Sequence, residues 1–574
     1  MKVKKNKYRP LIILFFLLAI IGIIIFLNPI SDLFNLIIRG SKFATTGFSG
    51  EIISEEALEK YFTPNQKKID VIHYSIHVDL RPQEKIIFGK TGIDFRITDS
   101  TLSSIDFNFY DNMTVDSLFL NGEEIQFVHE GTLLRIEKHN IPDSAIATVY
   151  YHGTPKSLGF GSFNFGEFEN RDVVYSLSEP IYASTWFPCS DIPTDKAMAD
   201  IYITNDSSKT SVSNGKLINT LIYNDKKTFH WKTFYPIATY LIAVYSADYV
   251  SFSDEIIFND SLSTPINYYV FPEHIEEAKT DFKINKNAIK FFSKKFGQYP
   301  FIKEKYGVAE FLWDLGAMEH QTITGIGERF VSGNNFFKDI YIHELAHQWW
   351  GDAVSPATWN DVWLNEGFAT YSEALYWEAQ AGEDALESTM LSKFGDFPSG
   401  TLYNPGTHLF SDLIYNKGAW TLHMLRSEIG DESFFEALRN YYEKFKYKNA
   451  STDDFKNVAE KVSGKNLSKF FEQWVYEGEG IPDLEIEYIK GEDSRKNFGI
   501  KISQKQNKYS VFYFPLEVRF SFPRKPFADS LFYISSRDTL INVTVPAQPS
   551  AVEIDRKNKL LAKIKILNSD EIGE

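Results

Sequence analysis

The segment His343–His347 reads H-E-L-A-H, and it constrains this chain of 574 residues more than any other feature. Residues four apart lie about one turn apart on an α-helix, so the imidazoles of His343 and His347 project from the same face. Two imidazoles held in this way suit Zn²⁺, and catalytic zinc sites take three protein ligands and keep the fourth position for water. The spacing therefore predicts a helix with a metal site on one face.

Glu366 follows His347 by nineteen residues and is the candidate third ligand. Residues 351–361 between them are rich in Gly, Asp, Ser, Pro and Asn, which indicates a turn that ends with Asn360 or Asp361 as a helix cap. Apolar residues then recur at helical spacing until Gly382. The sequence thus predicts two neighbouring helices that together hold one zinc ion.

Glu344, between the two histidines, is the candidate general base. Zinc lowers the pKa of a bound water to about 7 and polarises a carbonyl group. A carboxylate beside it can accept the proton of the water and pass it to a leaving amine. The residues therefore indicate a metal-dependent hydrolase.

Further segments resemble the aminopeptidase N and leukotriene A4 hydrolase family of zinc metallopeptidases, the gluzincin type. They are G-A-M-E-H at 316–320, N-E-G-F-A at 365–369, Y-N-K-G-A at 415–419 and W-F-P-C-S-D-I-P at 186–193. The resemblance runs from about Asp70 to at least Pro482. It implies zinc ligation by His343, His347 and Glu366, with Glu344 as general base and Tyr415 as donor to the oxyanion.

The resemblance also implies how a substrate is held. Glu319 matches the glutamate that binds the free amino terminus, and Glu179 falls where a Gln or Glu assists it. An ammonium between two carboxylates is strongly favoured, whereas a peptide amide there has no matched partner. The expected substrate-binding residues are Glu179, Gly316, Ala317, Met318, Glu319 and His320.

One residue departs from the usual G-A-M-E-N pattern of the family, because His320 replaces the Asn. A histidine can still donate a hydrogen bond, but an ordinary histidine changes its charge near neutral pH. We therefore expect altered specificity or pH dependence. Glu373, seven residues after Glu366, lies on the same helical face and is either a partner of a ligand histidine or a plain surface carboxylate.

The N-terminus predicts a membrane anchor. An uninterrupted apolar run of seventeen residues at 11–27 follows a basic tail, and a spanning helix needs about 17–25 residues. The positive-inside rule places the tail in the cytoplasm and the rest outside. We expect an uncleaved signal anchor in the lipid bilayer of the cell membrane, with a single pass and an extracytoplasmic catalytic domain; the alternative is a cleaved signal peptide.

Composition excludes several classes. The net charge of −16 argues against a nucleic-acid partner. The sequence contains no G-x-x-x-x-G-K-[ST] phosphate-binding motif, so nothing indicates a nucleotide ligand. Cys189 is the only cysteine, so no internal disulfide can form. The oligomeric state and the preferred first side chain of the substrate stay open.

The predicted fold class is a multidomain α+β protein. It comprises a transmembrane helix, an antiparallel β domain, a thermolysin-like and mostly helical zinc domain, and a small C-terminal domain of β-sandwich type. The predicted limits are a cytoplasmic tail at 1–9, an anchor at 10–30, a tether at 31–62, the β domain at 63–253, the catalytic domain at 254–481 and the C-terminal β domain at 482–574.

The function that these features favour is a zinc aminopeptidase acting on peptides with a free N-terminus. Three alternatives remain. An epoxide hydrolase of the leukotriene A4 hydrolase kind shares the zinc motif, a catalytically silent membrane-tethered binding protein would not need the intact motif, and an endopeptidase would not need Glu179 and Glu319.

Overall fold

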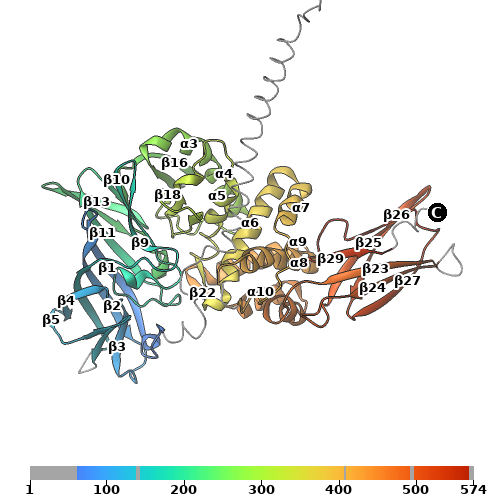
Figure 1. The fold of residues 1–574 in the computed structure, drawn as a ribbon, viewed down its shortest axis with the longest axis horizontal. Coiled ribbons are helices and arrows are strands. Elements are labelled where there is room, and N and C mark those ends of the chain that lie inside the picture. The colour runs from blue at the N-terminus through green and yellow to red at the C-terminus, as the bar shows by residue number, and fades with distance from the viewer. Residues whose placement is uncertain (1–60, 138–141, 406–408, 491–496, 568–574) are drawn as a thin grey trace, which may run out of the picture. The chain divides into compact units, whose positions relative to one another are not determined.

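The computed structural model describes residues 61–137, 142–405, 409–490 and 497–567 (Figure 1). Strands come first along the chain, helices follow, and strands return at the C-terminal end (Figure 1). The N-terminal β region and the helical region after it agree with the predicted order of elements. The domain limits drawn from the sequence stay predictions.

The predicted fold class is wrong in one respect, the transmembrane helix. No helix among the described residues is long and apolar enough to cross a membrane. The longest of them, α6 (Trp363–Ala381), carries three glutamates in 19 residues and is too polar for a bilayer. The anchor predicted at 10–30, the tail at 1–9 and nearly all of the tether lie outside the described residues, and the predicted location at the cell membrane stays a prediction.

The largest sheet has eight strands in the order β13-β14-β11-β1-β2-β8-β4-β5. Strand β1 buries every second side chain from Tyr74 to Leu80, as its alternating apolar residues predict. Ile72 is the exception, because a bulge between Val71 and His73 shifts the register, and Ile72 is 41% exposed. The bounds are β1 (Ile69–Arg81), β2 (Ile86–Ile97), β4 (Met113–Leu120), β5 (Glu123–Glu124), β8 (Ser144–Gly153), β11 (Met198–Asp206), β13 (Lys216–Tyr223) and β14 (Lys226–Lys232).

Two smaller sheets, β12-β15-β10-β9 and β3-β7-β6, complete the N-terminal β region. Cys189 is fully buried against the second of them, and its backbone exchanges two hydrogen bonds with Asn108, at 2.7 and 3.1 Å. The thiol is therefore a packed structural group. The bounds are β3 (Ser104–Asn108), β6 (Val128–Glu130), β7 (Leu133–Glu137), β9 (Ser162–Phe168), β10 (Arg171–Leu177), β12 (Thr210–Val212) and β15 (Tyr245–Ala247).

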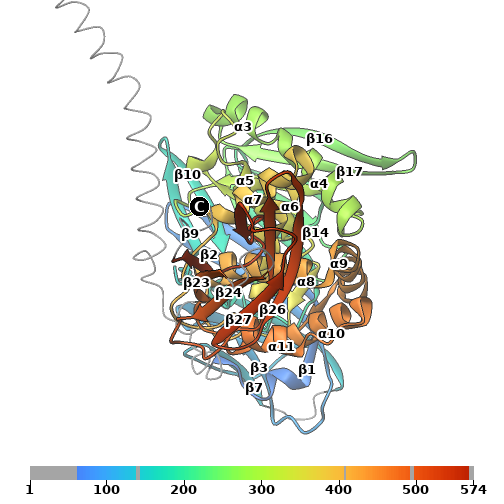
Figure 2. The ribbon, with the colours of Figure 1, turned by 90° about the vertical axis from the view of Figure 1, so that its right-hand side faces the viewer.

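A five-stranded sheet, β16-β17-β18-β20-β19, leads into the helical region. Its first two strands form a long hairpin that extends away from the helices (Figure 2). Its last strand, β19, contains Ala317 and Met318 of the G-A-M-E-H segment and pairs antiparallel with β20. The sheet spans both sides of the limit predicted at 253–254. The bounds are β16 (Val250–Asn259), β17 (Leu262–Val270), β18 (Tyr306–Phe311), β19 (Ala317–Met318) and β20 (Thr324–Gly327).

The helical region is organised around α5 and α6, which pack against each other. The turn before α6 is fixed by Asp361, whose carboxylate accepts hydrogen bonds from the backbone N–H and the hydroxyl of Thr358. The helix ends where Gly382 adopts a φ of +87°. The bounds are α3 (Ile275–Asp281), α4 (Lys283–Lys295), α5 (Lys338–Ala346), α7 (Glu383–Ser392), α8 (Gly418–Ile429), α9 (Asp431–Phe445), α10 (Thr452–Ser463) and α11 (Ser468–Phe471), with the short strands β21 (Val354–Pro356) and β22 (Lys448–Ala450).

The C-terminal strands form two sheets, β27-β24-β23-β29 and β26-β25-β28. Phe498 of the first and Phe520 of the second meet edge to face, with ring centroids 6.0 Å apart, so the sheets share one apolar layer. The predicted β-sandwich type describes this arrangement. The bounds are β23 (Asp483–Lys490), β24 (Asn497–Gln504), β25 (Phe514–Phe522), β26 (Lys525–Ile534), β27 (Asp538–Thr544), β28 (Ala551–Ile554) and β29 (Lys563–Ile566).

Candidate active site

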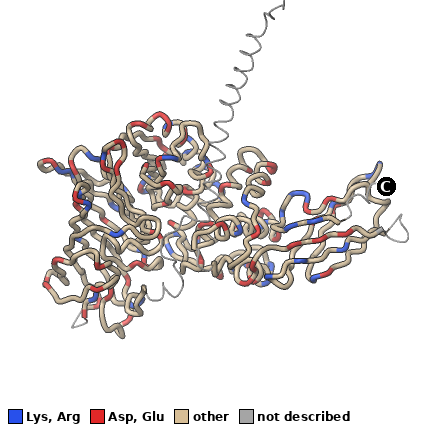
Figure 3. The backbone as a smooth tube through the Cα atoms, viewed as in Figure 1, with Lys and Arg blue, Asp and Glu red and all other residues tan. Residues whose placement is uncertain are grey.

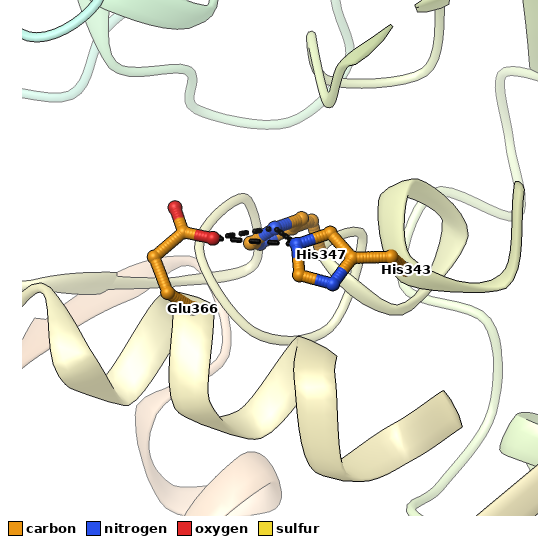
Figure 4. A group of neighbouring side chains, drawn as sticks. All are labelled: His343, His347 and Glu366. Carbon is orange, nitrogen blue, oxygen red and sulfur yellow. Dashed lines mark hydrogen bonds and ion pairs between the residues drawn. The ribbon is translucent and has the colours of Figure 1, made fainter. Parts of the chain in front are cut away.

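The three residues predicted to bind zinc converge between α5 and α6 (Figure 4). His343 lies in the last turn of α5, His347 follows directly after that helix, and Glu366 lies in the first turn of α6. The Nε2 atoms of the two histidines are 3.0 Å apart, and each lies 3.3 Å from Oε2 of Glu366. The spacing along the chain therefore produces one compact group of donor atoms.

The second nitrogen of each histidine is already engaged. Nδ1 of His343 lies 2.8 Å from a carboxylate oxygen of Glu373, and Nδ1 of His347 lies 2.9 Å from the backbone oxygen of Trp350. Both partners can only accept, so each imidazole donates its N–H there and turns the lone pair of Nε2 inward. Two nitrogen lone pairs and a carboxylate oxygen then face one another, an arrangement that requires a cation between them.

Zinc fits this group. A tetrahedral zinc ion with ligand bonds of about 2.0–2.1 Å separates its ligand atoms by about 3.3 Å, which matches the distances between His343, His347 and Glu366. Burial lowers the pKa of His343, but hydrogen bonds to Glu366 and Glu373 outweigh it and raise that pKa to about 9. Burial raises the pKa of Glu366, but the two imidazoles outweigh it and lower that pKa to about 2. The site thus favours positive charge at its centre.

Glu344 is buried beside the ligands, at 7% exposure, and its Oε2 has no hydrogen-bond partner among the described residues. Burial raises the pKa of Glu344 to about 8, although its interactions with the imidazoles of His343 and His347 oppose the shift. A carboxylate that is costly to ionise and free to accept a proton has the properties of a general base.

Glu179 and Glu319 add a second acidic group at the same place. One carboxylate oxygen from each lies within 4.8 Å of a carboxylate oxygen of Glu366. Acidic and basic residues are interspersed along the described backbone (Figure 3). At this place, by contrast, the three buried carboxylates of Glu179, Glu319 and Glu366 lie close together. Burial first, and then the neighbouring carboxylates, raise the pKa of Glu179 well above its ordinary value. Burial likewise raises the pKa of Glu319, so a nearby cation would favour the ionised form of both carboxyl groups.

Tyr415 lies in a π-helical turn, Leu413–Lys417, that leads into α8. Its ring lies over that of His343, with centroids 5.8 Å apart. Burial raises the pKa of Tyr415, and the nearby carboxylates of Glu366 and Glu179 raise it further. The hydroxyl therefore keeps its proton and can act as a hydrogen-bond donor in the site.

The segment Gly316–His320 runs along this group. Gly316 begins it with a φ of +154°, and its carbonyl accepts a hydrogen bond of 3.0 Å from the N–H of Gly327. Met318 and Glu319 are buried, and Ala317 is half-buried. His320 is fully buried, and burial lowers its pKa to about 3. The expected change of charge near neutral pH is therefore replaced by a histidine that stays neutral.

Comparison with known proteins decides the family. The model of the peptidase family M1 domain matches residues 280–396 and 403–474, and the model of the peptidase M1 N-terminal domain matches residues 71–241. The chain belongs to peptidase family M1. The resemblance drawn from the motifs is thereby confirmed, and the M1 models cover both the turn after β10 that carries Glu179 and the helical segments that carry the zinc-binding group.

Two M1 relatives show the extent of the match. Glutamyl aminopeptidase of Bitis rhinoceros is 26% identical over 458 residues, which cover 72% of this chain and 47% of that protein. Aminopeptidase N of Lactococcus lactis is 26% identical over 464 residues, 73% of this chain and 52% of that protein. The chain spans about half the length of the curated relatives it matches.

Solved structures agree in fold. The M1 zinc metallopeptidase from Deinococcus radiodurans superimposes with a TM-score of 0.64 at 25% identity, over 72% of this chain and 95% of that one; a mutant of it has been solved with a Tyr-Ser-Ala substrate. Aminopeptidase A of Legionella pneumophila superimposes with a TM-score of 0.77 at 20% identity, over 88% of this chain and 60% of that one, which shows the fold alone.

Gln348 is a supporting residue that the sequence did not reveal. Its side-chain N–H donates to the backbone oxygen of Glu319 at 3.2 Å and to Asp352 at 2.7 Å, while its oxygen accepts from the backbone N–H of Thr322 at 2.9 Å. It therefore links the end of the M1 zinc helix to the loop after β19 that carries Glu319. Its position one residue after His347 is the only signal that the sequence offers.

Glu373 and Lys393 form a second support. Besides its contact with His343, Glu373 accepts an ion pair of 2.7 Å from Lys393, and both side chains are largely buried. The choice left open by the sequence is resolved for Glu373, which is a partner of a histidine and not a plain surface group. Lys393 follows Glu373 by twenty residues, and nothing in this spacing indicates that the two side chains form an ion pair.

Replacing Glu373 with Gln should weaken zinc binding about 10- to 100-fold, because the neutral amide oxygen is a weaker acceptor for the N–H of His343 and no longer pairs with Lys393. Lys393→Met should weaken it less, and Lys393→Arg should restore it. Competition with a chromophoric chelator measures the zinc dissociation constant directly. An unchanged dissociation constant in Glu373→Gln would show that this contact does not tune the metal site.

Proposed function

We propose that this M1 protein is a zinc-dependent aminopeptidase that removes single residues from the free amino end of peptides. The observation that carries the proposal is the pair of buried carboxylates, Glu179 and Glu319, beside the zinc-binding group. The match to M1 aminopeptidases and the Tyr-Ser-Ala complex of the Deinococcus enzyme support a peptide substrate. The preferred first side chain stays open.

In this proposal the two carboxylates determine that a single residue is removed from the amino end of the peptide. A substrate ammonium satisfies Glu179 and Glu319 at once through charge-assisted hydrogen bonds, which are roughly twice as strong as neutral ones. An internal peptide amide brings one N–H and no charge, and it leaves buried carboxylates without a partner. The bond next to the amino terminus is then the one that lies at the zinc-binding group.

His343, His347 and Glu366 would hold the zinc ion. When bound, zinc supplies a Lewis acid and makes water acidic enough to act as a nucleophile near neutral pH. Glu344 accepts a proton on its free carboxylate oxygen and returns it to the leaving amine. The Tyr415 hydroxyl donates to the carbonyl oxygen of the substrate as negative charge develops there.

The proposal predicts that a free amine is required. Free aminoacyl fluorogenic amides should be cleaved and their N-acetylated copies should not, because acetylation removes the charge that Glu179 and Glu319 bind. Glu319→Gln should lower kcat/KM for the free amides about 10- to 150-fold, the loss of one charged hydrogen bond worth about 1.5–3 kcal/mol. Steady-state kinetics on matched pairs of substrates measures both effects.

The same matched pairs of substrates distinguish the aminopeptidase from the alternative functions. Equal cleavage of the acetylated copies would contradict the proposal and indicate an endopeptidase. Glu273→Gln changes an exposed glutamate that pairs with Arg171. It is the matched control and should leave the kinetics unchanged. Epoxide hydrolysis has no observation in its favour, and a silent binding protein would not need the free Oε2 of Glu344.

A further inference from the structure

His320 makes one specific contact inside the protein. Its Nδ1 lies 2.6 Å from the hydroxyl of Tyr245 in β15, and both residues are fully buried. The rings meet edge to face, with centroids 5.6 Å apart. The residue that departs from the usual family pattern is therefore held by a tyrosine from a different sheet.

The surroundings leave room for this contact. A Cβ atom on Gly325 of β20 would lie 2.2 Å from the Tyr245 hydroxyl and 2.9 Å from the ring of Phe311. Only a glycine at position 325 allows the hydroxyl to occupy its place, since any side chain would displace it. Tyr245, Gly325 and His320 thus fit together as one packed unit.

The direction of the hydrogen bond follows from counting partners. Burial raises the pKa of Tyr245 far above its ordinary value, so the hydroxyl keeps its proton, while His320 is neutral and carries one N–H. Among the described residues the Tyr245 hydroxyl has no other hydrogen-bond partner. If Nδ1 of His320 donated to Tyr245, two groups would be buried without partners, the hydroxyl proton of Tyr245 and the lone pair on Nε2 of His320. If the Tyr245 hydroxyl donates to Nδ1, only the N–H at Nε2 is left without a partner, so this direction is favoured.

That remaining atom belongs to the residue that directly follows Glu319, in the segment expected to bind substrate. The buried side-chain atoms without partners among the described residues include Oε1 of Glu179, Oε1 of Glu319, Oε2 of Glu344 and Nε2 of His320. The three oxygens accept, which suits an ammonium and a water. The nitrogen is the one donor of the four, and the backbone carbonyl oxygen of a peptide is the acceptor that such a substrate brings.

We propose that Tyr245 is a positioning residue that fixes His320 in the tautomer with its proton on Nε2, so that His320 offers an N–H to a backbone carbonyl of the bound peptide. An Asn at this position always presents an N–H, whereas an imidazole presents either a donor or a lone pair. The Tyr245 hydroxyl removes that ambiguity and lets a histidine stand where the family has Asn. The contact with substrate rests on the proposed function, but the tautomer does not.

Nitrogen NMR of the zinc-loaded protein with ¹⁵N-labelled histidine tests the tautomer without any substrate. The signal of His320, assigned by its loss in His320→Asn, should show a bare Nδ1 and a protonated Nε2. In Tyr245→Phe, which keeps the ring and removes the hydroxyl, that pattern should change toward a mixture or the opposite tautomer. A protonated Nδ1 in the unmodified protein, or an unchanged pattern in Tyr245→Phe, would overturn the proposal.

A double-mutant cycle tests the consequence for the substrate. Tyr245→Phe should lower kcat/KM for free aminoacyl amides about 2- to 12-fold, the range for one ordinary hydrogen bond. In the background of His320→Asn the same change should have less than about a twofold effect, because an amide needs no tautomer to be set. Equal losses in the two backgrounds would mean that Tyr245 acts only through packing, which overturns the proposal. If no variant cleaves any amide, the proposed function fails, and the NMR result still decides the tautomer.

Discussion

Glu344→Gln is expected to lower kcat/KM for aminoacyl amides by about 10²- to 10⁴-fold, the usual contribution of a general base. The amide has nearly the same shape as the carboxylate but cannot accept a proton. Glu344 makes no contact through Oε2 that the fold needs, and burial makes its charge costly. Zinc content and thermal stability should therefore be kept, and stability can even rise.

The measurement is steady-state kinetics together with zinc analysis and thermal unfolding of the same preparation. Glu276→Gln provides a matched control, because Glu276 lies on the exposed side of α3 and its carboxylate forms its ion pair with Lys279 of the same helix. The control should retain full activity. If Glu344→Gln kept more than a tenth of the activity with full zinc content, another group would have to be the base.

Removal of zinc is the second large effect. Activity should fall to background after chelation and return with added Zn²⁺, since the nucleophilic water depends on the metal. Thermal stability should fall as well, because a metal that binds only the folded state stabilises it by about 2.7 kcal/mol at a free concentration 100 times its dissociation constant. Without the cation, the inward-facing atoms of His343, His347 and Glu366 lose their common partner.

Glu366→Gln should reproduce both effects, because a neutral amide oxygen is a weaker ligand than the carboxylate. Its zinc content should fall, and added chelator should shift its Tm less than that of the unmodified protein, since less metal is bound to begin with. A chelator-independent activity, or an undiminished zinc content in Glu366→Gln, would be incompatible with the assigned ligand set.

The zinc-binding group was predictable because its parts are local. His343 and His347 are one helical turn apart, and the turn before α6 is marked by loop and capping residues, so the sequence predicts a second helix that brings Glu366 beside them. The alternation in β1 was equally readable. A bulge that turns Ile72 outward was not, since it depends on pairing with β2 rather than on the residues of β1.

The supports of the site depend on contacts between distant segments, which carry no periodic signal. Tyr245 is one of 31 tyrosines, and only the fold shows that it meets His320. Lys393 reaches Glu373 from beyond α7. The neutral state of His320 follows from its burial, whereas the sequence predicted an ordinary titrating imidazole. Such properties appear only once the chain is folded.

Anomalous diffraction on either side of the zinc absorption edge, from crystals of the active protein, tests the central claim most directly. The account predicts one difference peak at about 2.0–2.2 Å from Nε2 of His343, Nε2 of His347 and a carboxylate oxygen of Glu366. The absence of a peak at that place in active protein, or a peak held by other residues, would contradict it.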